Sequence, residues 1–220
     1  MTNLKLSFIT CTDSPVPLED QVEQACASGV DAVWLSAKKL SVKELLIKGA
    51  QIKEICRFKK VSFLVDERPD VALALDADGI HLGVEDIPIA WARQILGGRK
   101  AIVCSVSSLG QAMHCSKEGV TMLAVGPLFK KEADDVHVNN KNGVQIYRDD
   151  ANSAVDLIRL VKERVKAPVI GIGGINLSNV GEVIKAGAVG VAVSRAICNA
   201  PSIKDAAKIM IEKLAALKAL

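Results

Sequence analysis

The stretch Pro168–Ser194, PVIGIGGINLSNVGEVIKAGAVGVAVS, carries the strongest signals for the fold. It begins with an unbroken apolar run, Val169–Ile172, which is typical of a strand buried on both faces of a parallel sheet. A helical segment, Asn179–Ala186, comes next, and a second apolar run, Val189–Val193, follows it. The stretch is therefore predicted to form a strand, a helix and a second strand parallel to the first.

Glycines end the first of these strands. Gly173 and Gly174 would let backbone N–H groups approach a ligand closely, and Asn176 or Ser178 is expected to cap the helix behind them. The start of a helix attracts anions, most often phosphate. The second strand ends at Val193, followed by the polar Ser194. We therefore predict a phosphate site at this end of the unit; the alternative is that the glycines serve only tight packing.

A similar pattern, a small residue or glycine followed by an apolar strand, recurs along the chain. It appears at residues 28–36 (SGVDAVWLS), 76–83 (DADGIHLG), 118–126 (EGVTMLAVG) and 186–194 (AGAVGVAVS). Repetition of one strand–helix unit is typical of α/β architectures. The predicted strands are Leu6–Thr10, Ala32–Ser36, Val61–Val65, Gly79–Leu82, Ala101–Ser105, Met122–Gly126, Val169–Ile172 and Val189–Val193.

Eight such units and a final helix, Ile203–Leu217, predict a closed (β/α)8 TIM barrel. The length of 220 residues suits a single domain over residues 1–220, and an apolar fraction of 50% suffices for a full core. The alternative is an open, doubly wound sheet of flavodoxin-like order. That arrangement would leave the eighth strand and the final helix without a role.

Composition narrows the class of partner and the compartment. The net charge is +3 and aromatic residues make up 3% of the chain, so a nucleic-acid partner is not expected. Six cysteines lie far apart without a CxxC pair, which predicts core residues in a reducing cytoplasm rather than a zinc or disulfide scaffold. No apolar segment approaches the length of a membrane span. We expect a cytoplasmic protein that does not bind membranes, and homo-oligomer formation stays open.

One connection is unusually long. It runs from Phe129 to about Asp149 and leaves the carboxyl end of the sixth predicted strand. Loops of this length in compact domains are commonly functional lids or disordered segments. We interpret residues 129–149 as a lid over the site, with disorder as the alternative.

In a barrel the chemistry lies where the strands end, so the polar residues at those positions can be collected directly. They are Ser36, Lys38, Asp66, Glu67, Arg68, Glu85, Asp86, Ser105, Gly126 and Pro127. Mg²⁺ prefers one or two carboxylates together with phosphate oxygens, and Glu67 and Asp86 could offer the carboxylates. A surface ion pair with Arg68 or Arg93 is the alternative for each acid.

Nucleophilic catalysis is not predicted. His81 lies inside an apolar strand, where a core role is commoner than that of a base, and neither His114 nor His137 can be placed against the acidic residues. No Ser-His-Asp or Cys-His arrangement can be argued from the sequence. Cys104 is expected to face the helices, since it precedes Ser105 in one strand.

The residues resemble the family of thiamine phosphate synthase and the TenI-type thiazole tautomerases. The resemblance covers nearly the whole chain and is strongest at residues 63–88 (FLVDERPDVALALDADGIHLGVEDIP), 125–129 (VGPLF) and 168–197. It implies a (β/α)8 barrel that joins hydroxymethylpyrimidine diphosphate to a thiazole phosphate, releases pyrophosphate and uses Mg²⁺. Small phosphorylated substrates are therefore the expected partners.

The resemblance also implies roles for individual residues. Glu67 and Asp86 would hold Mg²⁺, with Glu67 in place of the family's aspartate, and Lys38 would neutralise pyrophosphate. Ser105 matches the serine that faces the pyrimidine. Lys131, in the long loop, could supply a further charge. The implied substrate-binding residues are Ser36, Asp66, Gly126, Gly173, Gly174, Val193 and Ser194.

Several positions depart from the family pattern. Ser36 stands where the family has an arginine, and a lysine cannot reproduce the bidentate hydrogen bonding of that arginine. Trp34 stands where the family has a glutamine. Ser107 occupies a position that is often the acid/base histidine of the tautomerases. We predict a thiamine phosphate synthase-like transferase. The alternatives are a thiazole tautomerase and a phosphate-binding paralogue without turnover.

Overall fold

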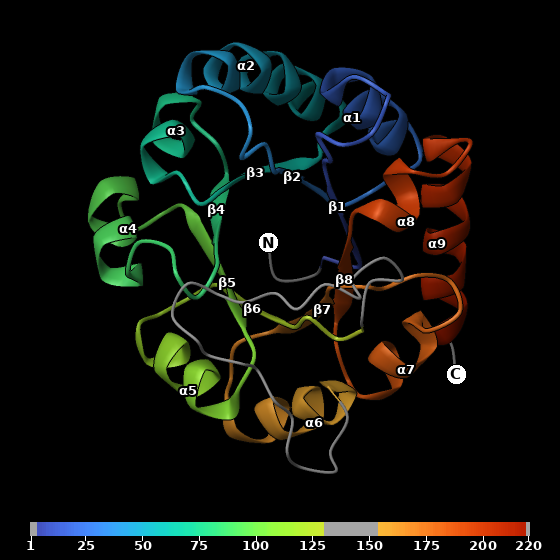
Figure 1. Cartoon of the computed structure of the whole chain (residues 1–220). Helices are drawn as coiled ribbons and strands as arrows, with labels where there is room; N and C mark the ends of the chain where they lie inside the picture. Colours follow the sequence, from blue (N-terminus) through green and yellow to red (C-terminus); the bar gives the residue numbers. More distant parts are fainter. Residues whose placement is uncertain (1–3, 130–153, 219–220) are drawn as a thin grey trace.

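Strands and helices alternate along the chain in the computed structural model, which describes residues 4–129 and 154–218 (Figure 1). The strands are short and lie within a residue or so of their predicted bounds. They are β1 (Leu6–Ile9), β2 (Ala32–Leu35), β3 (Ser62–Asp66), β4 (Gly79–Leu82), β5 (Ala101–Val106), β6 (Met122–Val125), β7 (Val169–Ile172) and β8 (Gly190–Val193).

The strands form one closed parallel barrel. Each strand pairs with the next in sequence order, and β8 pairs with β1 through Phe8 and Val193. The prediction of a (β/α)8 TIM barrel is therefore confirmed, and the alternative of an open sheet is wrong. Because all the strands are parallel, their carboxyl ends lie on one rim of the barrel.

Helices form a ring around the barrel (Figure 1). They are α1 (Leu18–Ala27), α2 (Val42–Lys59), α3 (Pro69–Ala74), α4 (Ile89–Leu96), α5 (Leu109–Lys117), α6 (Ala154–Arg164), α7 (Val180–Lys185), α8 (Arg195–Cys198) and α9 (Ile203–Lys218). Local sequence explains several boundaries. Ser41 and Glu44 form a capping box at the start of α2, and Pro69 opens α3.

Apolar side chains pack in two layers. The outer layer lies between the strands and the helices and includes Phe8, Phe63 and Ile102. The inner layer fills the barrel itself and includes Trp34, Leu64 and Met122. Successive side chains of a strand point to opposite faces, which divides each strand between these layers.

The cysteines follow the outer layer, as predicted for core residues. Five of the six are buried, Cys11 is partly exposed, and all six are free thiols. Cys104 faces the helices, where its Sγ lies 3.3 Å from the Sγ of Cys115 on α5. A strand and the helix that follows it therefore bring two thiols into contact.

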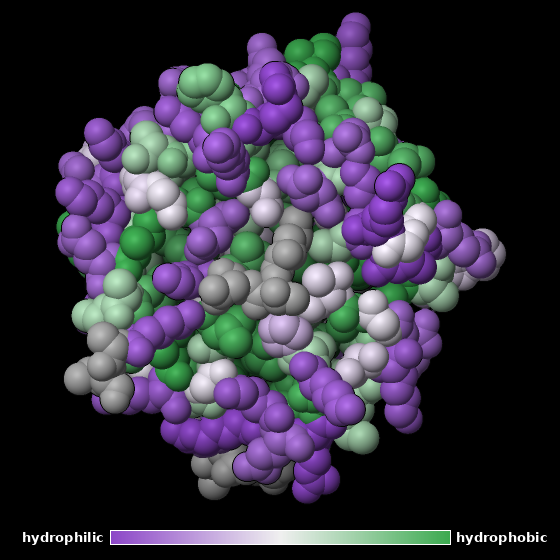
Figure 2. Space-filling model, turned by 180° about the vertical axis from the view of Figure 1, so that it is seen from behind, coloured by the Kyte–Doolittle hydropathy of each residue, from purple (hydrophilic) through white to green (hydrophobic). Residues whose placement is uncertain are grey.

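The surface is mostly polar on the face shown in Figure 2, where hydrophilic side chains cover much of the periphery and hydrophobic ones lie between them. Within residues 4–129 and 154–218, no helix has both the length and the apolar character that crossing a membrane requires.

Candidate active site at the carboxyl rim

Lys38 and Glu67 meet at the ends of β2 and β3, where they form an ion pair. The hydrogen bond to Glu67 is the main cause that raises the pKa of Lys38, and the nearby charges of Glu67, Asp86 and Asp66 raise it further. Burial acts in the opposite direction. The predicted lysine and carboxylates therefore lie together at one part of the rim.

Glu67 has a left-handed backbone conformation, with φ of 63°. Its N–H donates to the carbonyl of His81 at 2.9 Å, which fixes this residue to the end of β4. A non-glycine residue in this region is strained, and such residues cluster at functional sites. This left-handed conformation makes the chain turn sharply directly after β3.

Asp86 lies half-buried beyond the end of β4. Its Oδ2 accepts a hydrogen bond from the N–H of Gly83 at 2.5 Å, which folds the loop back on itself. The remaining carboxylate oxygen and the Glu67 carboxylate are hard oxygen donors of the kind that Mg²⁺ uses. Among the described residues no group of three His, Cys, Asp or Glu could hold a metal. This donor set fits Mg²⁺, since that ion takes one or two carboxylates and completes its shell with water and substrate phosphate.

The glycines after β7 pack against the segment that follows β6. Gly173 and Gly174 have φ of 89° and 68°, and a Cβ on Gly174 would lie 2.5 Å from the carbonyl oxygen of Phe129. A Cβ on Gly126 would lie 2.1 Å from the carbonyl oxygen of Ile172. Tight packing is thus one reason for these glycines, and it holds their loop at the same rim as Lys38.

The predicted helix cap after these glycines is wrong. The helix α7 has Asn179 as its N-cap residue, whereas Asn176 and Ser178 belong to the turn before it. Asn179 Oδ1 accepts from the N–H of Asn176 at 2.9 Å, and its Nδ2 donates to the carbonyl of Gly174 at 3.0 Å. The asparagine side chain therefore ties the turn to the glycine loop instead of capping the helix.

Val193 ends β8 and Ser194 follows it directly, at the same rim as the glycine loop. Ser194 is the N-cap residue of the short helix α8, and its carbonyl accepts from the N–H of Ile197 at 2.9 Å. Ser36, which follows β2, is held by Thr10: its N–H donates to Thr10 Oγ1 at 2.9 Å. The structure thus brings the predicted residues from β2, β3, β4, β7 and β8 to one rim.

A hydrogen-bonded group that the sequence reasoning missed joins three strand ends. His81 Nδ1 lies 3.2 Å from Asp66 Oδ1, and His81 Nε2 lies 2.7 Å from Ser105 Oγ. The ring of Trp34 stacks on the imidazole, with centroids 4.6 Å apart and planes at 25°. The structure therefore contains a Ser-His-Asp contact that was not predicted from the sequence alone. The alternation of side chains along β3, β4 and β5 could have predicted this contact, because it turns Asp66, His81 and Ser105 towards the interior of the barrel.

Ser107 takes part in a local turn. Its N–H donates to Gln111 Oε1 at 2.8 Å, and its hydroxyl donates to the same oxygen at 3.1 Å. Both polar groups of Ser107 are thus engaged by its own loop. The predicted Lys131 and the loop from residue 130 to about Asp149 lie outside the described residues.

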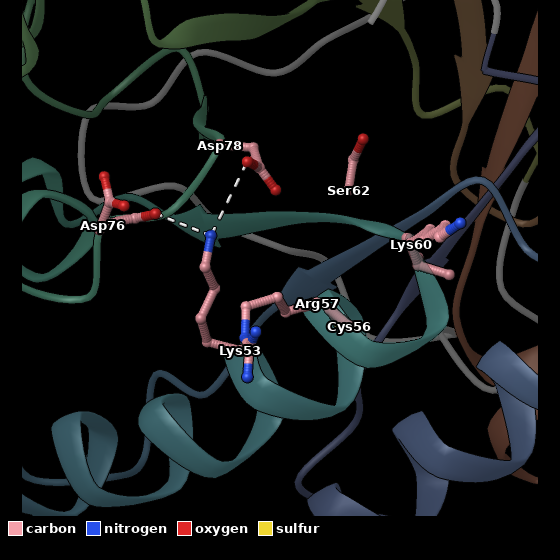
Figure 3. Close-up of a pocket in the computed structure, with 8 residues that line it drawn as sticks. Lys53, Cys56, Arg57, Lys60, Ser62, Asp76 and Asp78 are labelled. Atoms are coloured by element: carbon pink, nitrogen blue, oxygen red, sulfur yellow. Dashed lines mark hydrogen bonds and ion pairs between the residues drawn. The ribbon is translucent and has the colours of Figure 1, made fainter.

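A polar pocket of about 370 Å³ lies at the opposite rim, near the amino end of β3 (Figure 3). It is lined by residues that include Arg57, Lys60 and Ser62. Lys53 points into it and donates to the carbonyl of Asp76 at 2.8 Å, and it lies 3.7 Å from Asp78 Oδ1. Chemistry in such barrels takes place at the carboxyl ends of the strands, so this pocket is not the candidate active site.

The fold is that of a (β/α)8-barrel protein, and the polar residues at the carboxyl rim form its candidate active site. Residues 6–197 match the family described as thiamine monophosphate synthase. The chain belongs to this family, as the resemblance in its motifs predicted.

Individual proteins of this family are similar in sequence to the chain over nearly its full length. The chain is 32% identical over 216 residues to thiamine-phosphate synthase of Clostridium acetobutylicum, with 96% of each protein covered. It is 35% identical to thiamine-phosphate synthase of Methanosarcina barkeri, covering 96% of this chain and 91% of that protein. The solved structure of thiamine phosphate pyrophosphorylase from Pyrococcus furiosus superimposes with a TM-score of 0.84, at 32% identity and 98% coverage of both chains. These similarities support thiamine phosphate synthase, a transferase of thiamine biosynthesis, as the function.

Proposed function

We propose that this chain joins hydroxymethylpyrimidine diphosphate to thiazole phosphate at the carboxyl rim and releases pyrophosphate. The observation that carries the proposal is the placement of Lys38, Glu67 and Asp86 on the same rim as the glycine loop after β7. One half of this rim offers a cation and carboxylates for a diphosphate. The other half offers backbone N–H groups for a monophosphate. We propose, too, that the protein acts in the cytoplasm.

The reaction breaks a C–O bond and forms a C–N bond. The bond between the pyrimidine methylene carbon and the diphosphate oxygen breaks, and its electron pair leaves with pyrophosphate. The lone pair of the thiazole nitrogen then bonds to that carbon. No proton needs to be transferred in either event, so the protein contributes mainly by placing charges where they develop.

Lys38 would neutralise the leaving pyrophosphate, and Lys131 would add a second cation. Ser36 and Asp66 would line the diphosphate side, and Ser105 would contact the pyrimidine. Gly126, Gly173, Gly174, Val193 and Ser194 would bind the thiazole phosphate through backbone groups and the serine hydroxyl. This division places the two phosphorylated substrates on neighbouring parts of one rim.

Glu67 and Asp86 would hold Mg²⁺ in this scheme. When bound, the ion would supply positive charge that stabilises pyrophosphate as it leaves. Glu67 pairs with Lys38, so its carboxylate already lies at the part of the rim where the diphosphate would bind. On substrate binding, Lys38 would contact the pyrophosphate and Glu67 would bind the Mg²⁺ ion.

The two alternatives differ in what they require. A thiazole tautomerase needs an acid/base group at the Ser107 position, but this serine is bonded to Gln111 within its own loop. That contact counts against the tautomerase. A binding paralogue without turnover is favoured by Ser36, which replaces the arginine of the family pattern.

The test is formation of thiamine phosphate from the two purified substrates, with and without Mg²⁺. We expect turnover that requires Mg²⁺ and that Asp86→Ala abolishes, whereas Asp20→Asn on the exposed side of α1 leaves it unchanged. Binding of thiazole phosphate without turnover would support the paralogue. Isomerisation of a thiazole phosphate without added pyrimidine would support the tautomerase.

A further inference from the structure

Cys104 on β5 and Cys115 on α5 form a pair of thiols that the proposed reaction does not use. Their Sγ atoms are hydrogen-bonded at 3.3 Å, and the two residues are 5% and 6% exposed. A disulfide has an S–S length of about 2.05 Å, so the two sulfurs need to approach each other by only about 1.3 Å to reach it. The pair is therefore close to the geometry of a covalent bond.

The contact also makes one of the two thiols the better nucleophile. When Cys115 ionises, the Cys104 thiol donates a hydrogen bond to its thiolate, and this bond is the main cause that lowers the pKa of Cys115, against the effect of burial. The same hydrogen bond raises the pKa of Cys104, and burial raises it further. Because the thiolate is the reactive form, Cys115 would react first and Cys104 second.

The pair lies directly beneath the surface of the helix ring. Cys115 follows the exposed His114 on α5, and Met113 before them is 41% exposed. The helix is nine residues long, and a short helix at the periphery of a domain can open locally. Burial therefore slows bulky reagents but leaves the thiols within reach of an oxidant as small as hydrogen peroxide.

We propose that Cys104 and Cys115 are a modification site at which hydrogen peroxide forms a reversible disulfide, and that this disulfide lowers activity at the carboxyl rim. The Cys115 thiolate attacks one peroxide oxygen: an S–O bond forms, the O–O bond breaks, and hydroxide leaves and takes up a proton as water.

The neighbouring thiol completes the reaction. Cys104 attacks the sulfur of the sulfenic acid on Cys115: the S–S bond forms, the S–O bond breaks, and the hydroxyl leaves as water with the proton of the Cys104 thiol. The two sulfurs together lose two electrons, and the peroxide is reduced to two molecules of water. A dithiol reverses the modification by thiol–disulfide exchange.

The position of the pair connects it to the rim. Cys104 directly precedes Ser105, whose Oγ lies 2.7 Å from His81 Nε2, and Ser107 further on bonds to Gln111 of α5. A disulfide would draw β5 and α5 together and displace the segment between them. A shift of about 1 Å at an active site can lower a rate by about 100-fold. This effect on activity rests on the proposed function, whereas formation of the disulfide does not.

The first measurement is peptide mapping by mass spectrometry. The protein is treated with hydrogen peroxide, and its remaining thiols are alkylated in denaturant before digestion with trypsin. Both cysteines lie in one tryptic peptide, Ala101–Lys117, because no lysine or arginine occurs between them. We expect this peptide to lose two hydrogens and to take up no alkyl group, and dithiothreitol to restore both thiols.

Two outcomes of the peptide map would overturn the inference. One is a peptide that still takes up two alkyl groups at a peroxide dose that fully oxidises the partly exposed Cys11. The other is a sulfinic acid on Cys104 or Cys115 in place of the disulfide. In Cys115→Ala the mass loss of two hydrogens should be absent, and Cys104→Ala repeats this control from the other side of the pair if thermal unfolding shows that the first variant is not folded.

The second measurement is the rate of thiamine phosphate formation before and after the same treatment. We expect kcat/KM of the wild type to fall ~10-fold or more and dithiothreitol to restore it. Cys115→Ala should keep its rate after peroxide. The matched control is Cys11→Ser, which removes the thiol beside Cys198 and should lose activity as the wild type does. Full activity of wild-type protein that carries the disulfide, or equal losses in wild type and Cys115→Ala, would overturn the link to the rim.

The reduced wild-type protein separates this inference from the proposed function. Reduced protein without turnover would overturn the proposed function, while the peptide map would still decide whether the disulfide forms. Reduced protein that turns over but forms no disulfide would overturn this inference alone.

Discussion

Lys38 and Glu67 contact each other across the ends of β2 and β3, so a cation and an anion that are both proposed to serve the diphosphate form an ion pair with each other. Glu67 has a left-handed backbone conformation and therefore lies in a strained turn. Exposed ion pairs contribute little to stability, and the lysine is 68% exposed. The pair therefore has more bearing on ligand binding than on folding.

Glu67→Gln should weaken the response to Mg²⁺. The amide keeps the shape of the side chain but loses the charge that a hard cation requires, and we expect the Mg²⁺ concentration for half-maximal activity to rise by roughly tenfold or more. The measurement is a Mg²⁺ titration of the initial rate. Glu118→Gln, at an exposed position after α5, is the control. An unchanged titration curve would remove Glu67 from the metal site.

Gly174→Ala should lower both stability and phosphate affinity. The substitution places a side chain at φ of 68° and a Cβ 2.5 Å from the Phe129 carbonyl oxygen. A non-glycine residue in this region costs ~1–3 kcal/mol before the clash is counted. Urea unfolding and calorimetric titration with thiazole phosphate measure the two effects. The matched control is Gly98→Ala, where a Cβ would meet nothing within 4 Å. Equal behaviour of the two variants would contradict this account.

The ion pair between α1 and α2 should make stability fall in acid. Burial raises the pKa of Glu19, but the hydrogen bond from Lys48 at 2.9 Å, with backbone and charge contributions, lowers it more, so the net pKa is below its ordinary value. The folded state then binds fewer protons than the unfolded chain, so this stability is present above the ordinary glutamate pKa and is lost as pH falls through the folded pKa.

We therefore expect the loss of stability between about pH 5 and pH 3 to be smaller in Glu19→Gln than in the wild type. Thermal unfolding at several pH values measures the difference. Glu23→Gln, at an exposed position of the same helix, should follow the wild type. Parallel acid curves for wild type and Glu19→Gln would show that this pair does not contribute.

Thiol labelling should distinguish Cys11 from the other cysteines. It is partly exposed, whereas the other five are buried. Burial is the main cause that raises the pKa of Cys198 to about 12, and the hydrogen bond to Cys115 raises the pKa of Cys104. Since the thiolate is the reactive form, we expect one fast equivalent with an alkylating reagent at pH 8, absent in Cys11→Ser. Mass spectrometry identifies the site, and rapid labelling of Cys198 would contradict the prediction.

The sequence predicted the barrel well because its evidence was local. Unbroken apolar runs such as Val169–Ile172 and glycines before strands mark each unit without reference to any other. The same reasoning placed Lys38, Glu67 and Asp86 on one rim, since parallel strands have all their carboxyl ends together. Strand order and closure followed from the number of units.

What the sequence did not predict depends on register and on side-chain geometry. The contact of His81 with Asp66 requires these residues to be directly paired, and a shift of one position would have turned one of them towards the helices. Similarly, Asn176, Ser178 and Asn179 are all residue types that can cap a helix, and only the folded turn places Asn179 at the N-cap position while its side chain bonds to Asn176 and Gly174. The left-handed conformation of Glu67 could not be predicted from its residue type, because glutamate does not favour positive φ.

The stacking of Trp34 on His81 gives the barrel a built-in optical reporter. The chain has two tryptophans, and Trp91, on α4, is 61% exposed, whereas Trp34 is fully buried against the imidazole. In a Trp91→Phe variant, all indole emission would come from the side chain that stacks on His81. Occupancy of the rim could then be followed by fluorescence in real time, without a label and without turnover.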